Sequence, residues 1–143
     1  MVLQIDGDEY QRNVWDILDH IAEYHPAAHV LCITPSTLHP EQWMTHMQRV
    51  AGPDPAVAYT ELDRSVQNNK RYAGLMKGII REWNKSRADV RDGNLRGNGK
   101  KVAVIDAFRA HSIAKGQHGV TNEQLFTDGL HWTAKGYEVS LEL

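Results

Sequence analysis

The chain has 143 residues, of which 16 are Lys or Arg and 18 are Asp or Glu, giving a formal net charge of −2. This near balance excludes a global field that would attract nucleic acid or an anionic membrane surface. Hydrophobic residues make up 41% of the chain, enough to bury a core, and the length fits a single domain over residues 1–143. No run of 18 apolar residues occurs, and the N-terminus lacks the basic and apolar segments of a signal peptide. We therefore expect a cytoplasmic protein without a transmembrane segment.

An amphipathic helix is predicted over residues 8–24. Asp6 or Asp8 can cap its first turn, and Pro26 ends it, because proline has no amide hydrogen and its ring clashes with the preceding helical turn. The apolar residues recur at helical spacing and so share one face: Tyr10, Val14, Ile17, Leu18 and Ile21. This pattern indicates a helix that packs one side on a core.

A buried strand is predicted over residues 29–33, HVLCI, a short apolar run between two prolines. Cys32, the only cysteine, lies within this run, so we expect a buried, unreactive thiol and no disulfide within the chain. A loop follows, and then a short helix is predicted over residues 40–50.

A long helix is predicted over residues 60–85 from apolar positions spaced by three, four or seven: Leu62, Val66, Ala73, Met76, Ile80 and Trp83. The polar, glycine-rich segment 91–101 then forms either a solvated connection or a phosphate-binding loop. The second interpretation is the weaker one, because phosphate loops usually run from a strand to a helix and this segment runs from a helix to a strand. A second apolar strand follows over residues 102–108, and a loop through residues 117–126 leads towards a last helix that starts near Thr133.

Strands that are joined by helices predict an α/β fold with parallel strands. Only two strands are evident, whereas a sheet that is covered by helices on both faces needs several more. The predicted architecture is therefore incomplete on its N-terminal side.

Asp128 and His131 are the candidate catalytic residues. In triad chemistry a histidine takes the proton of a nucleophile, and a carboxylate on its other ring nitrogen fixes the orientation of the ring. A spacing of three residues, with Gly129 between them, lets the chain fold the carboxylate back onto the imidazole within one turn. The alternative is a local turn in which the aspartate caps the backbone and the histidine is merely exposed.

Metal and nucleophile motifs give weaker signals. The eight histidines are scattered without metal-ligand spacing, so we expect no metal and no cofactor: His20, His25, His29, His39, His46, His111, His118 and His131. None of the five serines lies in a nucleophile motif. Ser36, directly after the first predicted strand, is the best placed of them, and we interpret it as a loop serine.

Several segments together resemble one family. FTDGLHWTAKGYEV, residues 126–139, resembles the last motif block of the SGNH (GDSL-type) hydrolases, and HVLCITPSTLHPEQW is similar to a segment of their isoamyl acetate-hydrolysing esterase branch. NNKRYAGLMKGIIREWNK, followed by VAVIDAF, resembles the helix and strand before the final loop, and DGDEYQRNVWDILDHI is similar to the helix after the family's Asn block. The resemblance covers nearly the whole chain in the family's order.

The resemblance implies the C-terminal portion of a flavodoxin-like three-layer α/β/α sandwich whose N-terminal strands are missing. It implies His131 as general base and Asp128 as its orienting carboxylate in a Ser-His-Asp triad that hydrolyses small-molecule esters. The family's Gly-Asp-Ser, oxyanion-hole and Asn blocks have no counterpart in the 143 residues. The alternative is a non-catalytic remnant or interaction module with the same fold.

If the N-terminal strands of the family's sheet are missing, one edge of the predicted strand 29–33 has no partner. The strand that would pair with residues 29–33 is missing, so its backbone groups and apolar side chains are available to another chain. We therefore expect the chain to self-associate through this edge, or to be marginally stable.

Overall fold

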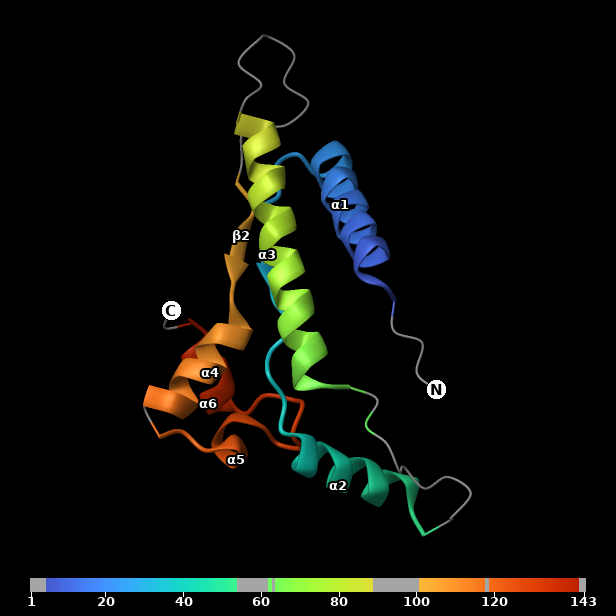
Figure 1. Ribbon diagram of the computed structural model, residues 1–143. Helices are drawn as coiled ribbons and strands as arrows, with labels where there is room; N and C mark the ends of the chain where they lie inside the picture. Colours follow the sequence, from blue (N-terminus) through green and yellow to red (C-terminus); the bar gives the residue numbers. More distant parts are fainter. Residues whose placement is uncertain (1–4, 54–61, 63, 89–100, 118, 142–143) are drawn as a thin grey trace.

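The computed structural model describes residues 5–53, 62, 64–88, 101–117 and 119–141 (Figure 1). The described part contains both helices and parallel strands, so it has the mixed α/β character expected from the sequence. The elements are α1 (Gly7–Tyr24), β1 (Leu31–Ile33), α2 (Pro40–Ala51), α3 (Val66–Ala88), β2 (Ala103–Ile105), α4 (Ala107–Gln117), α5 (Asn122–Leu125) and α6 (Ala134–Leu141). No helix among these residues is long and apolar enough to span a membrane.

The two strands form a small parallel sheet in which Leu31 pairs with Ala103 and Ile33 with Ile105. Helices α1 and α3 lie side by side against it (Figure 1). The first hydrophobic core fills the space between them. Its buried members are Leu18, Ile79, Ile80, Trp83 and Val102, and Val30 and Cys32 pack against it from the strand side. The core therefore contacts only one face of the sheet.

The opposite face of the sheet carries apolar side chains that are open to solvent. Successive strand residues point to opposite faces, so Leu31 and Ile33 point away from the side that Cys32 shares with the core. Leu31 is 55% exposed and Ile33 48% exposed. In the described part of the chain, β1 pairs with β2 alone, which leaves its other edge without a strand partner.

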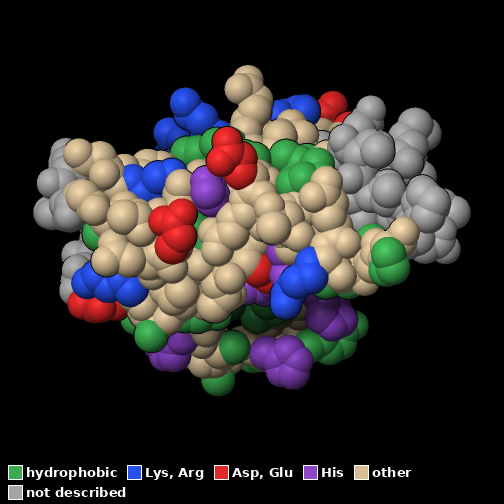
Figure 2. All heavy atoms as spheres, turned by 90° about the horizontal axis from the view of Figure 1, so that it is seen from below, with side chains coloured by type: hydrophobic (Ala, Val, Ile, Leu, Met, Phe, Trp, Pro, Cys, Tyr) green, Lys and Arg blue, Asp and Glu red, His purple; other side chains and the backbone are tan. Residues whose placement is uncertain are grey.

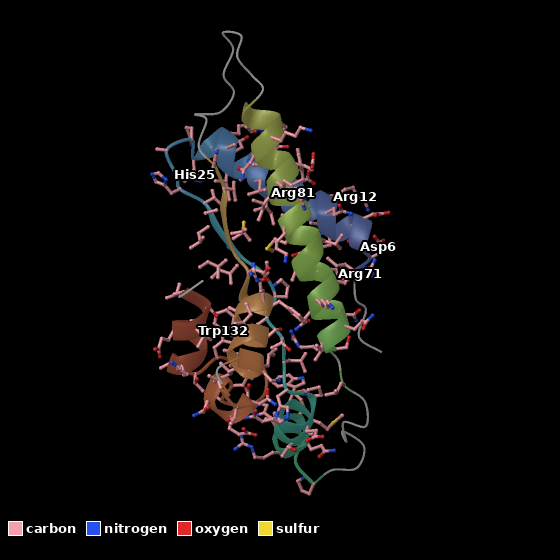
Figure 3. The ribbon with its side chains drawn as sticks, turned by 60° about the vertical axis from the view of Figure 1, so that its left-hand side comes forward. Asp6, Arg12, His25, Arg71, Arg81 and Trp132 are labelled. Atoms are coloured by element: carbon pink, nitrogen blue, oxygen red, sulfur yellow. The ribbon has the colours of Figure 1, made fainter. Side chains whose placement is uncertain are left out.

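A second hydrophobic core joins α4, α5 and α6. Ala114, Leu125, Phe126 and Val139 are its buried members. Trp132 packs against it and donates from its indole nitrogen to Ser36 Oγ at 3.0 Å, which ties this core to the segment after β1 (Figure 3). The described residues thus form two cores, one at the sheet and one at the C-terminal helices.

Asp106 joins the two cores at the end of β2. Its Oδ1 accepts a hydrogen bond from the Arg109 amide at 3.1 Å, as a helix cap does, and its Oδ2 pairs with Lys77 of α3. The Thr34 hydroxyl, directly after β1, lies 3.5 Å from the same carboxylate. One side chain therefore links both strand ends to α3 and α4.

The predicted helices 8–24 and 40–50 agree with α1 and α2 to within one residue at each end. Asp6 caps α1, because its carboxylate accepts hydrogen bonds from the amides of Asp8 and Glu9 at 2.8 and 2.9 Å. Helix α3 begins at Val66 rather than at residue 60. The Ser65 hydroxyl accepts a hydrogen bond from the Asn68 amide at 3.1 Å and so acts as the helix cap.

In the last third of the chain, the predicted second strand is confirmed but is shorter than expected, and a predicted loop contains a helix. The strand expected over residues 102–108 ends at Ile105, because Asp106 caps α4 and turns the backbone into a helix. The loop expected through residues 117–126 contains α5, whose capping box pairs Thr121 with Gln124. Residues 91–100 of the considered phosphate loop lie outside the described residues.

Candidate active site

A tight turn holds Asp128 and His131. Its ends are joined by an antiparallel bridge between Phe126 and Trp132, and the Thr127 amide donates to the His131 carbonyl at 2.9 Å. Gly129 has a φ of +94°, a conformation that side chains other than glycine adopt only with strain. The glycine between the two candidate residues is therefore what permits the turn.

The Asp128 carboxylate uses its two oxygens for different bonds. Oδ1 accepts from the amides of Leu130 and His131 at 2.9 and 2.8 Å, which is the local turn that the sequence offered as an alternative. Oδ2 lies 2.6 Å from His131 Nδ1, which is the contact expected for a catalytic pair. The local turn and the expected contact are therefore both present, and a catalytic role for the pair stays a prediction.

The Asp128–His131 pair has the orientation of a general base and its carboxylate. The carboxylate only accepts, so the proton of a neutral His131 sits on Nδ1 and the lone pair of Nε2 is unoccupied. The His131 side chain is 70% exposed and that of Asp128 is 13% exposed. The imidazole is thus open to solvent while the carboxylate is shielded.

Electrostatics keep the carboxylate charged. Burial alone raises the pKa of Asp128, but the hydrogen bonds from the His131 ring and from the amides of His131 and Leu130 outweigh it and lower the pKa to about 2. The Asp128 carboxylate is consequently ionised at neutral pH.

Helix α2 packs against the turn that holds Asp128 and His131. The His39 amide, just before α2, donates to the Gly129 carbonyl at 2.8 Å. A Cβ atom added at Gly129 would lie 2.4 Å from the Trp43 amide nitrogen and 2.6 Å from the His39 carbonyl oxygen. The turn therefore rests directly on the first turn of α2, and it lies at the carboxyl end of the strands, as expected (Figure 1).

Trp43 and His46 of α2 complete the surroundings. The Trp43 ring is buried and meets His131 edge-on at a centroid distance of 6.3 Å, and it stacks on His46 at 5.4 Å. Histidine side chains appear at the surface of this end of the molecule (Figure 2). Sequence reasoning gave neither residue a role, although their spacing of three places them on one face of α2.

Ser36 is not a nucleophile in this structure. Its side chain is buried, its hydroxyl donates to the Thr37 carbonyl at 2.8 Å, and it accepts from Trp132 at 3.0 Å. The other four serines also make local hydrogen bonds, and no bond joins any of them to His131: Ser65, Ser86, Ser112 and Ser140. The expectation of a structural loop serine at position 36 agrees with these contacts.

Within the described ranges, no three His, Cys, Asp or Glu side chains are grouped so that they could hold a metal ion. Comparison of the chain with protein-family models, with curated proteins and with solved structures gives no significant match. A functional assignment therefore depends on the geometry around Asp128 and His131.

Proposed function

We propose that this chain supplies the general base and the orienting carboxylate of a serine-type ester hydrolase of the SGNH (GDSL-type) class. The carrying observation is the 2.6 Å contact between Asp128 Oδ2 and His131 Nδ1, which leaves Nε2 of an exposed ring available. In this role Nε2 takes the proton of a serine hydroxyl as the hydroxyl attacks an ester carbonyl. Asp128 stabilises the imidazolium that forms, and His131 then returns the proton to the leaving alcohol.

The nucleophile in this proposal comes from a segment outside the 143 residues. All five serines of the chain are engaged elsewhere, and a base with its carboxylate cannot form an acyl-enzyme without a positioned hydroxyl and an oxyanion hole. A flavodoxin-like three-layer sandwich would provide that segment. The apolar face at Leu31 and Ile33 and the unpaired edge of β1 are where its further strands and helices would attach.

The second candidate function is that of an interaction module without catalysis. The exposed apolar face of the sheet favours it, because such surfaces mark sites of association. In that case the Asp128–His131 contact only stabilises the turn.

The coding sequence upstream of Met1 separates the two candidates. We expect it to encode a Gly-Asp-Ser segment, and we expect the extended protein to react with a fluorophosphonate at that serine. Asp128→Asn and His131→Ala should each slow the labelling by at least about 100-fold while the protein stays folded. An extended protein without this serine, or labelling that is unaffected by His131→Ala, would favour the interaction module.

A further inference from the structure

A second imidazole, that of His46, faces the Asp128 carboxylate. Its Nε2 lies 3.9 Å from Asp128 Oδ2, the same oxygen that contacts His131 Nδ1 at 2.6 Å. The His46 side chain is only 25% exposed, far less than that of His131. One carboxylate oxygen is therefore shared by two titratable rings from distant parts of the chain.

The His46 ring is held in one orientation. Arg49 Nη2 lies 3.3 Å from its Nδ1, and because a guanidinium only donates, Nδ1 must accept and the proton of neutral His46 sits on Nε2. Parallel stacking on Trp43, with 15° between the rings, fixes the plane. The N–H bond therefore faces Asp128.

The distance between His46 Nε2 and Asp128 Oδ2 determines how the two groups interact. At 3.9 Å neutral His46 makes no hydrogen bond with Asp128, since such bonds between nitrogen and oxygen span about 2.7–3.2 Å. Once His46 is protonated, Nδ1 can no longer accept from Arg49, and the same distance from Nε2 gives an ion pair with the carboxylate. The contact thus acts only when His46 carries a proton.

We propose that His46 is a positioning residue whose protonation state sets how strongly Asp128 supports a proton on His131. The inference rests on the proposed function, in which His131 must gain a proton during the reaction. Protonated His46 forms an ion pair with the same Asp128 oxygen and adds a positive charge near the His131 ring, so it opposes protonation of His131. When His46 is neutral, the Asp128 carboxylate supports a proton on His131 to its full extent.

The two guanidinium groups that lie near His46 do not change their charge over the pH range in which histidine titrates. Arg49 lies on the same helix, and the Arg64 guanidinium lies 5.9 Å from the Trp43 ring centre. Both stay protonated throughout. Among these described groups, only the two histidines can therefore produce a pH-dependent change at the shared oxygen.

Proton NMR titration of the two rings in the chain itself tests the proposal. We expect His46→Phe, which keeps a ring on Trp43 but cannot be protonated, to raise the proton affinity of His131 about threefold. His46→Gln should change it in the same direction. Because coupling between two sites is reciprocal, His131→Gln should raise the proton affinity of His46 by the same factor.

His20→Gln on α1 replaces a ring that contacts Tyr24 far from the site; it serves as the control and should leave both curves unchanged. An unchanged His131 curve in both His46 variants would overturn the proposal, as would an unchanged His46 curve in His131→Gln. If the His46 variants do not fold, the His46 curve in His131→Gln still gives the coupling. None of these measurements needs an ester substrate, so failure of the proposed function and failure of this coupling give different results.

Discussion

The Asp128 carboxylate shows how one residue can satisfy two demands at once. Its Oδ1 closes the turn through two backbone amides, and its Oδ2 meets the His131 ring. A turn built by the carboxylate itself fixes where that carboxylate points, so the geometry needed for chemistry follows from the same bonds that stabilise the loop. This is why a spacing of three residues was enough to predict the contact from the sequence.

The lowered pKa of Asp128 makes stability depend on pH. A carboxyl whose pKa falls from 3.8 to about 2 on folding contributes stability that is present above pH 3.8 and is lost as the pH falls through 2. We expect Asp128→Asn to lower the free energy of unfolding at pH 7 by about 1–2 kcal/mol, with solvent screening included. The difference between the two proteins should shrink towards pH 2 in urea denaturation.

The control for this change is Asp16→Asn at an exposed position of α1. It should alter stability by less than about 0.5 kcal/mol. If the difference in free energy of unfolding between Asp128→Asn and the unmodified chain did not change with pH, stability would not depend on the ionisation of Asp128 as predicted.

Gly129 is required both by its backbone conformation and by the space around it. An alanine there would adopt a strained positive φ and would press its Cβ into the backbone of α2. We expect Gly129→Ala to cost roughly 2–4 kcal/mol of stability, measured by urea denaturation. Gly119→Ala, with a φ of +63° and nothing within 4 Å, should cost only about 1 kcal/mol. Equal losses would mean that contact with α2 does not matter.

At the scale of elements, helix α4 is fastened to α6 by a buried histidine. His111 has no exposed surface, and its Nε2 lies 2.9 Å from the Gly136 carbonyl and 3.0 Å from Ser140 Oγ. The carbonyl can only accept, so Nε2 carries the proton. Nδ1 is buried without a hydrogen-bond partner among the described residues. A second proton on this ring would therefore place a charge between two helices.

Burial lowers the pKa of His111, despite its bond to the Gly136 carbonyl. A histidine whose pKa is lowered on folding favours the folded state fully above the ordinary value of 6.5, and that stability is lost as the pH falls below it. We expect the melting temperature of the chain to fall between pH 7.5 and pH 5. His111→Gln, which keeps a donor but does not titrate, should show a smaller fall. An equal fall in both proteins would assign the pH dependence to other groups.

The elements differ in how well the sequence predicts them. Helix α1 has a strong apolar period and a capping aspartate, so its bounds were predicted almost to the residue. Residues 102–108 form a continuous apolar run, a pattern that does not show where a strand gives way to a helix. The signal for the change was Asp106, a capping residue inside the run. The contacts of Trp43 and His46 with the turn join segments more than 80 residues apart, and a local pattern does not predict them.

At the scale of the whole molecule, the sheet has one covered face and one open face. The sequence predicted the free edge of β1 from the resemblance to larger proteins, and β1 pairs only with β2 in the described residues. The exposure of Leu31 and Ile33 adds an apolar surface beside that edge. Edge and surface together favour contact with a second copy of the chain.

We therefore expect light scattering to detect species larger than a monomer, increasing with protein concentration. Replacing Leu31 and Ile33 together by threonine should reduce this association, because threonine suits a strand but is more polar. Val50→Thr, at an exposed apolar position of α2, is the matched control and should leave it unchanged. A monodisperse monomer with a cooperative thermal transition would contradict the prediction.

The presence of two cores joined at Asp106 has a consequence for how the molecule opens. Units with separate cores can exchange their amide hydrogens in separate opening events, and the link between them decides how far these events are coupled. In native-state hydrogen exchange we expect the amides of α1 and α3 to form one group and those of α4 and α6 another. Lys77→Met, which removes the ion pair with Asp106, should increase the difference in hydrogen-exchange protection between the two groups of amides. The turn that holds Asp128 and His131 belongs to the second group, so local opening of the first leaves the Asp128–His131 contact in place.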